Sequence, residues 1–106
     1  MRFEKEKREA CKLAKALLSS NDDYLDNVVN LFYIGNEIHQ DSWQTEFHIF
    51  NVIETETDHL PLKRVRELCS NDFLKKSDLE LARIIKNYSK QVEIACKDIL
   101  SKYGNA

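Results

Sequence analysis

FHIFNVIETETDHLPLKRVREL, residues 47–68, holds the only proline of the chain and its sharpest change of residue pattern. Apolar side chains at helical spacing fill residues 47–53, and a basic helix is predicted to begin at about Leu62. A proline drives the preceding residue towards extended geometry, so the chain is not expected to stay helical up to Pro61. We call the polar residues 54–61 the elbow, and we expect it to join two helical segments.

Composition favours helices in the rest of the chain. The 106 residues include only two glycines and one proline. A β-sandwich or barrel needs frequent turns, so it is not expected here. A chain of this length can also bury a core without help from a metal or a disulfide. We therefore predict an all-α single domain, residues 1–106, built as a bundle of about five helices with a long C-terminal helix.

The period of the apolar side chains places these helices. Pro61 suits the first turn of the fourth, and Leu62, Val65, Leu68 and Cys69 form its apolar side. Ser77 and Glu80 form a capping box that starts the last helix, and Gly104 ends it. The expected ranges are 3–18, 23–39, Trp43 to about Glu54, Pro61 to about Cys69, and 77–103, with one extra turn at 71–76.

The N-terminal residues MRFEKEKRE are charged throughout and do not resemble a secretory signal. No apolar run approaches the roughly 20 residues that cross a bilayer. Three widely spaced cysteines do not suggest a disulfide framework. We expect a cytoplasmic protein that has no membrane partner.

The net charge of −2 hides a sorted distribution. Residues 1–20 carry six Lys or Arg and three Glu, and residues 63–106 carry ten Lys or Arg and six Asp or Glu. Residues 21–62 carry nine carboxylates and no Lys or Arg. If these carboxylates gather on one surface after folding, that surface attracts a basic partner and speeds its encounter. The competing interpretation is that they are scattered around helix ends and paired by the basic flanks.

Common catalytic and metal-binding patterns are missing from the sequence. His39, His48 and His59 all lie in the acidic segment, but no two are spaced to share a helix face, and there is no Cys-x-x-Cys. We expect no catalytic residue, no metal and no cofactor. Lys and Arg at residues 63–66 and 75–76 are diluted by carboxylates. Because the pI of the whole chain is about 5.9, we interpret these residues as a solvated helix face and expect no nucleic-acid partner.

The elbow leaves an alternative open. His59 follows Asp58 directly, with Glu56 nearby, and carboxylates of this kind could tune an imidazole for acid–base or metal chemistry. The simpler structural interpretation is that Thr57 or Asp58 caps the turn before Pro61 and that His59 bonds a backbone carbonyl. A structural or regulatory helical domain without an acidic site is a third possibility.

The elbow sequence Glu54-Thr-Glu-Thr-Asp-His-Leu-Pro61, the apolar run before it and the helix Tyr88–Tyr103 resemble uncharacterised small helical proteins of bacteria. The size, helical pattern and acidic centre also resemble immunity proteins of contact-dependent growth-inhibition systems. The nearest is the helical one that neutralises a ribonuclease-A-like toxin. This resemblance implies a bacterial, non-enzymatic protein that binds a cognate basic toxin domain, of nuclease type, and covers its active cleft.

The contact residues expected for such a partner come from the charge map. Carboxylates would pair with toxin Lys, Arg or His side chains, and aromatic side chains would supply the desolvated anchors. The predicted partner-binding residues are Asp22, Asp23, Asp26, Tyr33, Glu37, Asp41, Trp43, Glu54, Glu56, Asp58 and His59.

Overall fold

The computed structural model describes residues 2–104. The predicted all-α domain with a long C-terminal helix is confirmed, with four α-helices and two short 3-10 helices in the described part of the chain. The elements are α1 (Glu4–Ser19), α2 (Tyr24–Ile38), η1 (Ser42–Gln44), α3 (His48–Thr57), η2 (Lys63–Leu68) and α4 (Asn71–Tyr103). None of these helices combines the length and the apolar character needed to cross a membrane.

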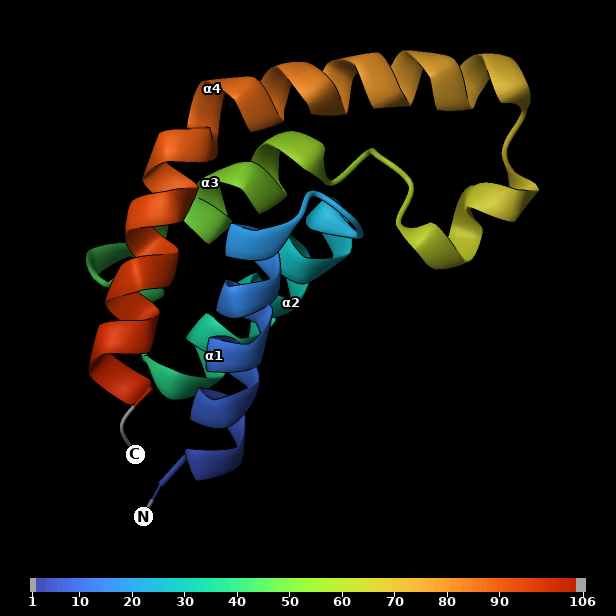
Figure 1. Cartoon of the computed structure of the whole chain (residues 1–106). Coiled ribbons are helices and arrows are strands. Elements are labelled where there is room, and N and C mark those ends of the chain that lie inside the picture. The colour runs from blue at the N-terminus through green and yellow to red at the C-terminus, as the bar shows by residue number, and fades with distance from the viewer. Residues whose placement is uncertain (1, 105–106) are drawn as a thin grey trace.

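Each α-helix packs against two neighbours, in the order α1, α2, α3, α4 and back to α1 (Figure 1). The long helix α4 changes direction along its length, so its two halves have different neighbours. Its C-terminal half runs beside α1, whereas its N-terminal half extends past the bundle to η2 (Figure 1). As a result, α2 and α3 lie side by side on one side of the molecule, and α1 and the C-terminal half of α4 lie on the other.

Phe47, the first residue of the 47–68 stretch, lies at the centre of the core and is 0% exposed. Its ring centroid lies 6.2 Å from that of Phe50 and 6.5 Å from that of Tyr103, the last residue of α4. Gly35 makes room for this ring, because a Cβ there would lie only 2.6 Å from the Phe47 Cγ. Phe47 therefore joins α2, α3 and the end of α4.

The predicted third helix was wrong at both ends. Trp43 belongs to η1, because the Asp41 carboxylate accepts a hydrogen bond from the Trp43 N–H at 3.1 Å and closes a single turn. The Thr45 hydroxyl then accepts from the Phe47 N–H at 3.1 Å, and α3 begins only at His48. The helix also continues to Thr57, so only the last four residues of the elbow lie outside it.

The fourth and last helices also differ from the prediction. The segment after Pro61 forms the 3-10 helix η2, and its expected apolar side is not buried, since Leu68 is 87% exposed. Helix α4 begins at Asn71, where the Ser70 hydroxyl accepts from the Phe73 N–H at 3.2 Å. Ser77 is a buried residue within this helix and not its cap. There is no Pro or Gly between Ser70 and Ser77, so the helix that begins after Ser70 continues through Ser77.

Candidate protein-binding face

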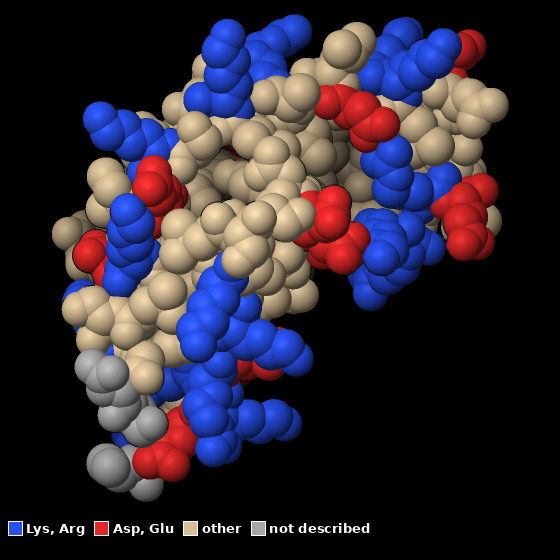
Figure 2. All heavy atoms as spheres, viewed as in Figure 1, with Lys and Arg blue, Asp and Glu red and all other residues tan. Residues whose placement is uncertain are grey.

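Helices α2, η1 and α3 form one side of the molecule, and none of the three contains a Lys or Arg. All three elements come from residues 24–57, which lie within the segment that lacks both residue types. The opposite side carries α1 and the C-terminal half of α4, and Figure 2 shows Lys and Arg side chains, with some Asp and Glu among them, over these helices and over η2 and the N-terminal half of α4. The charged side chains of α2 and α3 are thus all carboxylates, and Arg64 lies beside Asp26 and Tyr33 at the outward side of α2. We call the α2–η1–α3 side the acidic face.

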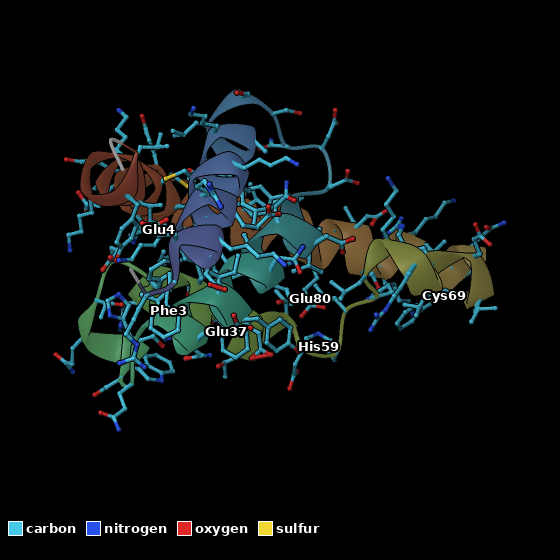
Figure 3. The ribbon with its side chains drawn as sticks, turned by 90° about the horizontal axis from the view of Figure 1, so that it is seen from below. Phe3, Glu4, Glu37, His59, Cys69 and Glu80 are labelled. Atoms are coloured by element: carbon cyan, nitrogen blue, oxygen red, sulfur yellow. The ribbon has the colours of Figure 1, made fainter. Side chains whose placement is uncertain are left out.

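Asp26, Asn30, Tyr33 and Glu37 recur at helical spacing on the outward side of α2. Tyr33 is 59% exposed, and its ring is supported by Phe32, whose centroid lies 5.1 Å away. In the view of Figure 3, Glu37 and His59 lie towards the same edge of the molecule, with Glu37 near Phe3 at the start of α1. Helix α2 therefore presents an exposed aromatic ring between two carboxylates.

Trp43 lies at the end of this face that is formed by η1. Its indole is 48% exposed and meets the His48 ring edge-on, with the centroids 5.3 Å apart. The His48 Nδ1 also lies 3.0 Å from the Trp43 carbonyl oxygen, so the two residues hold each other in place. Asp41 is exposed beside them. An ordered, exposed indole is suited to a protein contact.

Most of the nine carboxylates from residues 21–62 have no cationic partner within the described part of the chain. Only Asp23 and Glu46 lie within 4.0 Å of a Lys or Arg nitrogen, at 3.3 Å from the Lys63 Nζ and 3.4 Å from the Lys102 Nζ. Asp26 instead accepts the backbone N–H of Lys63 at 3.2 Å. Pairing by the basic flanks therefore accounts for two of the nine carboxylates.

Seven of these carboxylates fall into three groups along the chain. Asp22, Asp23 and Asp26 lie near the start of α2, and Glu37 and Asp41 follow at its other end. The 15 residues of α2 separate these groups by about 22 Å. Glu54 and Glu56 belong to the part of the elbow that forms the last turns of α3. A surface of this length matches a protein partner better than a small ligand.

One acidic residue that was not predicted as a contact is buried. The Glu46 side chain is 2% exposed, and its Oε1 accepts a hydrogen bond from the Tyr103 hydroxyl and lies 3.5 Å from the His39 Nε2. Its Oε2 faces the Lys102 Nζ. Burial opposes ionisation of this carboxyl, but the Tyr103 hydroxyl, the Glu46 backbone N–H, Lys102 and His39 outweigh it and lower its pKa. Glu46 thereby joins the turn before α3 to the end of α4.

We expect Glu46→Gln to lower the free energy of unfolding at pH 7 by about 1–3 kcal/mol, because it leaves buried donors facing an amide. The pKa of Glu46 is lower in the folded protein than in the unfolded chain, so the ionised carboxylate stabilises the fold above the ordinary glutamate pKa. This contribution is lost as the pH falls through the folded-state pKa of Glu46. The difference between the two proteins should therefore shrink below about pH 4. Urea unfolding across this pH range measures it.

Glu93→Gln is the matched control, because the exposed Glu93 forms only a surface ion pair with Lys97. It should change the free energy of unfolding by less than about 0.5 kcal/mol. A Glu46→Gln protein as stable as the wild type at pH 7, or one whose deficit is the same at every pH, would contradict a structural role for the ionised carboxylate.

His59 has a partner that the sequence did not indicate. Its Nε2 lies 2.9 and 3.0 Å from the two Glu80 carboxylate oxygens, and its Nδ1 lies 3.7 Å from the Asp58 Oδ1. The hydrogen bond with Glu80 raises the pKa of His59, and Asp58 adds to the effect. The predicted bond from His59 to a backbone carbonyl was therefore wrong. It failed because the N-terminal half of α4 passes over the elbow and supplies an acceptor 21 residues away.

The predicted cap before Pro61 was also wrong, since the Thr57 hydroxyl donates back to the Ile53 carbonyl at 2.7 Å within α3. Asp58 and His59 are both exposed, whereas Glu56 lies near Tyr88 and raises the pKa of its hydroxyl. Within residues 2–104, no three His, Cys, Asp or Glu side chains are grouped so that they could hold a metal ion. Within the elbow, His59 and Glu56 therefore contact α4, through Glu80 and Tyr88 respectively.

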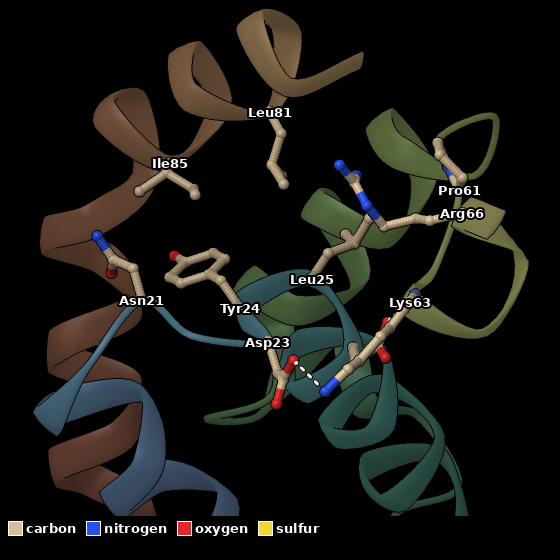
Figure 4. A pocket seen from close by; sticks show the side chains of 10 residues that line it. Asn21, Asp23, Tyr24, Leu25, Pro61, Lys63, Arg66, Leu81 and Ile85 are labelled. Carbon is tan, nitrogen blue, oxygen red and sulfur yellow. Dashed lines mark hydrogen bonds and ion pairs between the residues drawn. The ribbon is translucent and has the colours of Figure 1, made fainter. Parts of the chain in front are cut away.

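A cleft of about 340 Å³ lies where the start of α2, the elbow and α4 meet (Figure 4). Its walls are largely apolar, from Tyr24, Leu25, Pro61, Leu81 and Ile85. At its rim Lys63 pairs with Asp23, as the dashed line in Figure 4 marks. The cleft leaves no signal in the sequence because three separate segments of the chain form it. Lys63 and Asp23 at its rim form an ion pair with each other, so we do not identify the cleft as a catalytic site.

Comparisons with protein-family models, curated proteins and solved structures give no match to this chain. An interpretation of its function therefore rests on the geometry and charge of the two sides of the bundle.

Proposed function

We propose that this chain is a non-enzymatic immunity protein whose acidic face binds a cognate basic toxin domain, of nuclease type, and covers its active cleft. The observation that carries the proposal is the pairing of α2 with α3, two adjacent elements without a single Lys or Arg. A nuclease cleft is basic because it holds phosphates, so the carboxylates of this face compete for the same cations.

The exposed aromatic rings support a protein partner. Binding energy in protein interfaces is concentrated in a few residues, among which Trp and Tyr are enriched. Tyr33 lies between carboxylates on α2, and Trp43 lies at the η1 end of the same face. In this proposal the two rings are the anchors, and the surrounding carboxylates set the orientation and the rate of encounter.

The proposed contacts divide into a central set and an edge. The central set is Asp26, Tyr33, Glu37, Asp41, Trp43, Glu54 and Glu56. The edge lies at the elbow end, where Lys63 already neutralises part of the charge, and consists of Asp22, Asp23, Asp58 and His59.

Binding to nuclease domains of contact-dependent toxins tests the proposal. Isothermal titration should detect a 1:1 complex with one such domain, whose nuclease activity is lost on binding. Because exposed charges are screened by salt, the association rate should fall as the salt concentration rises from about 0.05 to 0.5 M. A chain that binds none of these domains, or that binds one without blocking its activity, would contradict the proposed function.

A further inference from the structure

The α1 side of the bundle has the opposite charge from the acidic face, and it contains a groove of its own. Arg8, Lys12 and Lys15 of α1 line this groove together with Leu100 and Tyr103 of α4. We propose that this basic groove binds the phosphate backbone of single-stranded nucleic acid. The expectation of no nucleic-acid partner rested on the overall pI, which averages two sides of unlike charge.

The cations form a row along α1. Lys5, Arg8, Lys12 and Lys15 recur at helical spacing, all are exposed, and none forms an ion pair within residues 2–104 (Figure 2). Ten residues of helix separate the first from the last, a span of about 15 Å. The exposed carboxylates Glu4 and Glu9 border the row, since Glu4 is four residues from Arg8 and Glu9 is four residues from Lys5, but neither forms an ion pair with it in the described chain. A row of this length faces more than one phosphate.

The charged side chains of the groove are hydrogen-bond donors, which complement the acceptor oxygens of a phosphate backbone. Lys and Arg side chains only donate, and phosphate oxygens only accept. Among the described lining residues there is no carboxylate.

Two further features fit a nucleic-acid strand. The Lys7 Nζ lies 5.5 Å from the centroid of the Tyr103 ring and adds a cation at one end of the groove. Leu100 and the edge of Tyr103 form an apolar wall that suits the sugar or base of a nucleotide whose phosphate lies on α1. The groove and the acidic face are on different sides, so this inference does not depend on the proposed function.

Fluorescence anisotropy with labelled 12-nucleotide single-stranded RNA and DNA tests the inference. Binding to the wild type is expected, with the logarithm of the affinity falling with the logarithm of the salt concentration. Each phosphate contact on a single strand contributes about −0.7 to this slope, so three contacts predict about −2. Arg8→Glu with Lys12→Glu should weaken binding at least tenfold and make the slope shallower.

Lys75→Glu with Lys76→Glu is the matched control, because both residues are exposed on the N-terminal half of α4 and the change of charge is the same. This control should keep the wild-type affinity within about twofold. Equal loss in both variants, no loss in the α1 variant, or no binding by the wild type at 50 mM salt would overturn the proposal. Displacement of the strand by polyglutamate at equal charge concentration would also overturn it and would indicate an acidic protein partner.

Discussion

Phe47→Ala is expected to lower the free energy of unfolding by about 3–5 kcal/mol, which for a domain of this size is a large part of the total. The ring is fully buried and packs on Phe50, on Tyr103 and against the backbone of Gly35. Because three helices meet at this ring, none can move into the space without breaking its other contacts. Urea unfolding followed by circular dichroism measures the loss.

Phe73→Ala is the matched control, since Phe73 is 43% exposed at the start of α4. It should lower the free energy of unfolding by about 1–2 kcal/mol at most, because nearly half of its surface is already in water. Equal losses in the two variants would show that Phe47 has no special place in the core.

Glu37→Lys combined with Glu56→Lys is expected to weaken binding to the cognate toxin domain about 100-fold. Both side chains are exposed and neither pairs with a Lys or Arg in the described chain, so the double variant should fold normally. Reversal replaces attraction to toxin cations by repulsion, and juxtaposed like charges cost several kcal/mol. Titration calorimetry and a nuclease-protection assay measure the effect.

Glu67→Lys with Glu93→Lys gives the same change in net charge on η2 and α4, away from the acidic face. This control should protect against the toxin as the wild type does. If it loses affinity as strongly as the acidic-face variant, total charge and not the proposed face governs binding.

The helical class and the sorted charge could be predicted from the sequence because both follow from local pattern. The spacing of the apolar side chains predicted the bounds of α1 and α2 to within about one residue. A segment without Lys or Arg has none of these side chains however the chain folds. The start of α4 could not be predicted in the same way. Ser70 and Ser77 are both good caps by residue type, and only the folded chain shows which one is used.

Two contacts near the site that the sequence did not indicate join residues far apart in the chain. Glu46 is held by Tyr103, which is 57 residues away, and His59 by Glu80, which is 21 residues away. Neither pairing leaves a local signal. The change in direction of α4 brings its two halves against different parts of the chain, and no periodicity encodes that arrangement (Figure 1).

Oxidative footprinting of the exposed aromatic side chains tests the acidic face most directly. In the free protein, Tyr33, Trp43 and Phe73 are all accessible, at 59%, 48% and 43% exposure. In the complex with a neutralised toxin domain, we predict that labelling of Tyr33 and Trp43 falls several-fold while that of Phe73 is unchanged. Protection of Phe73 with continued labelling of Tyr33 and Trp43 would place the toxin elsewhere and contradict the account.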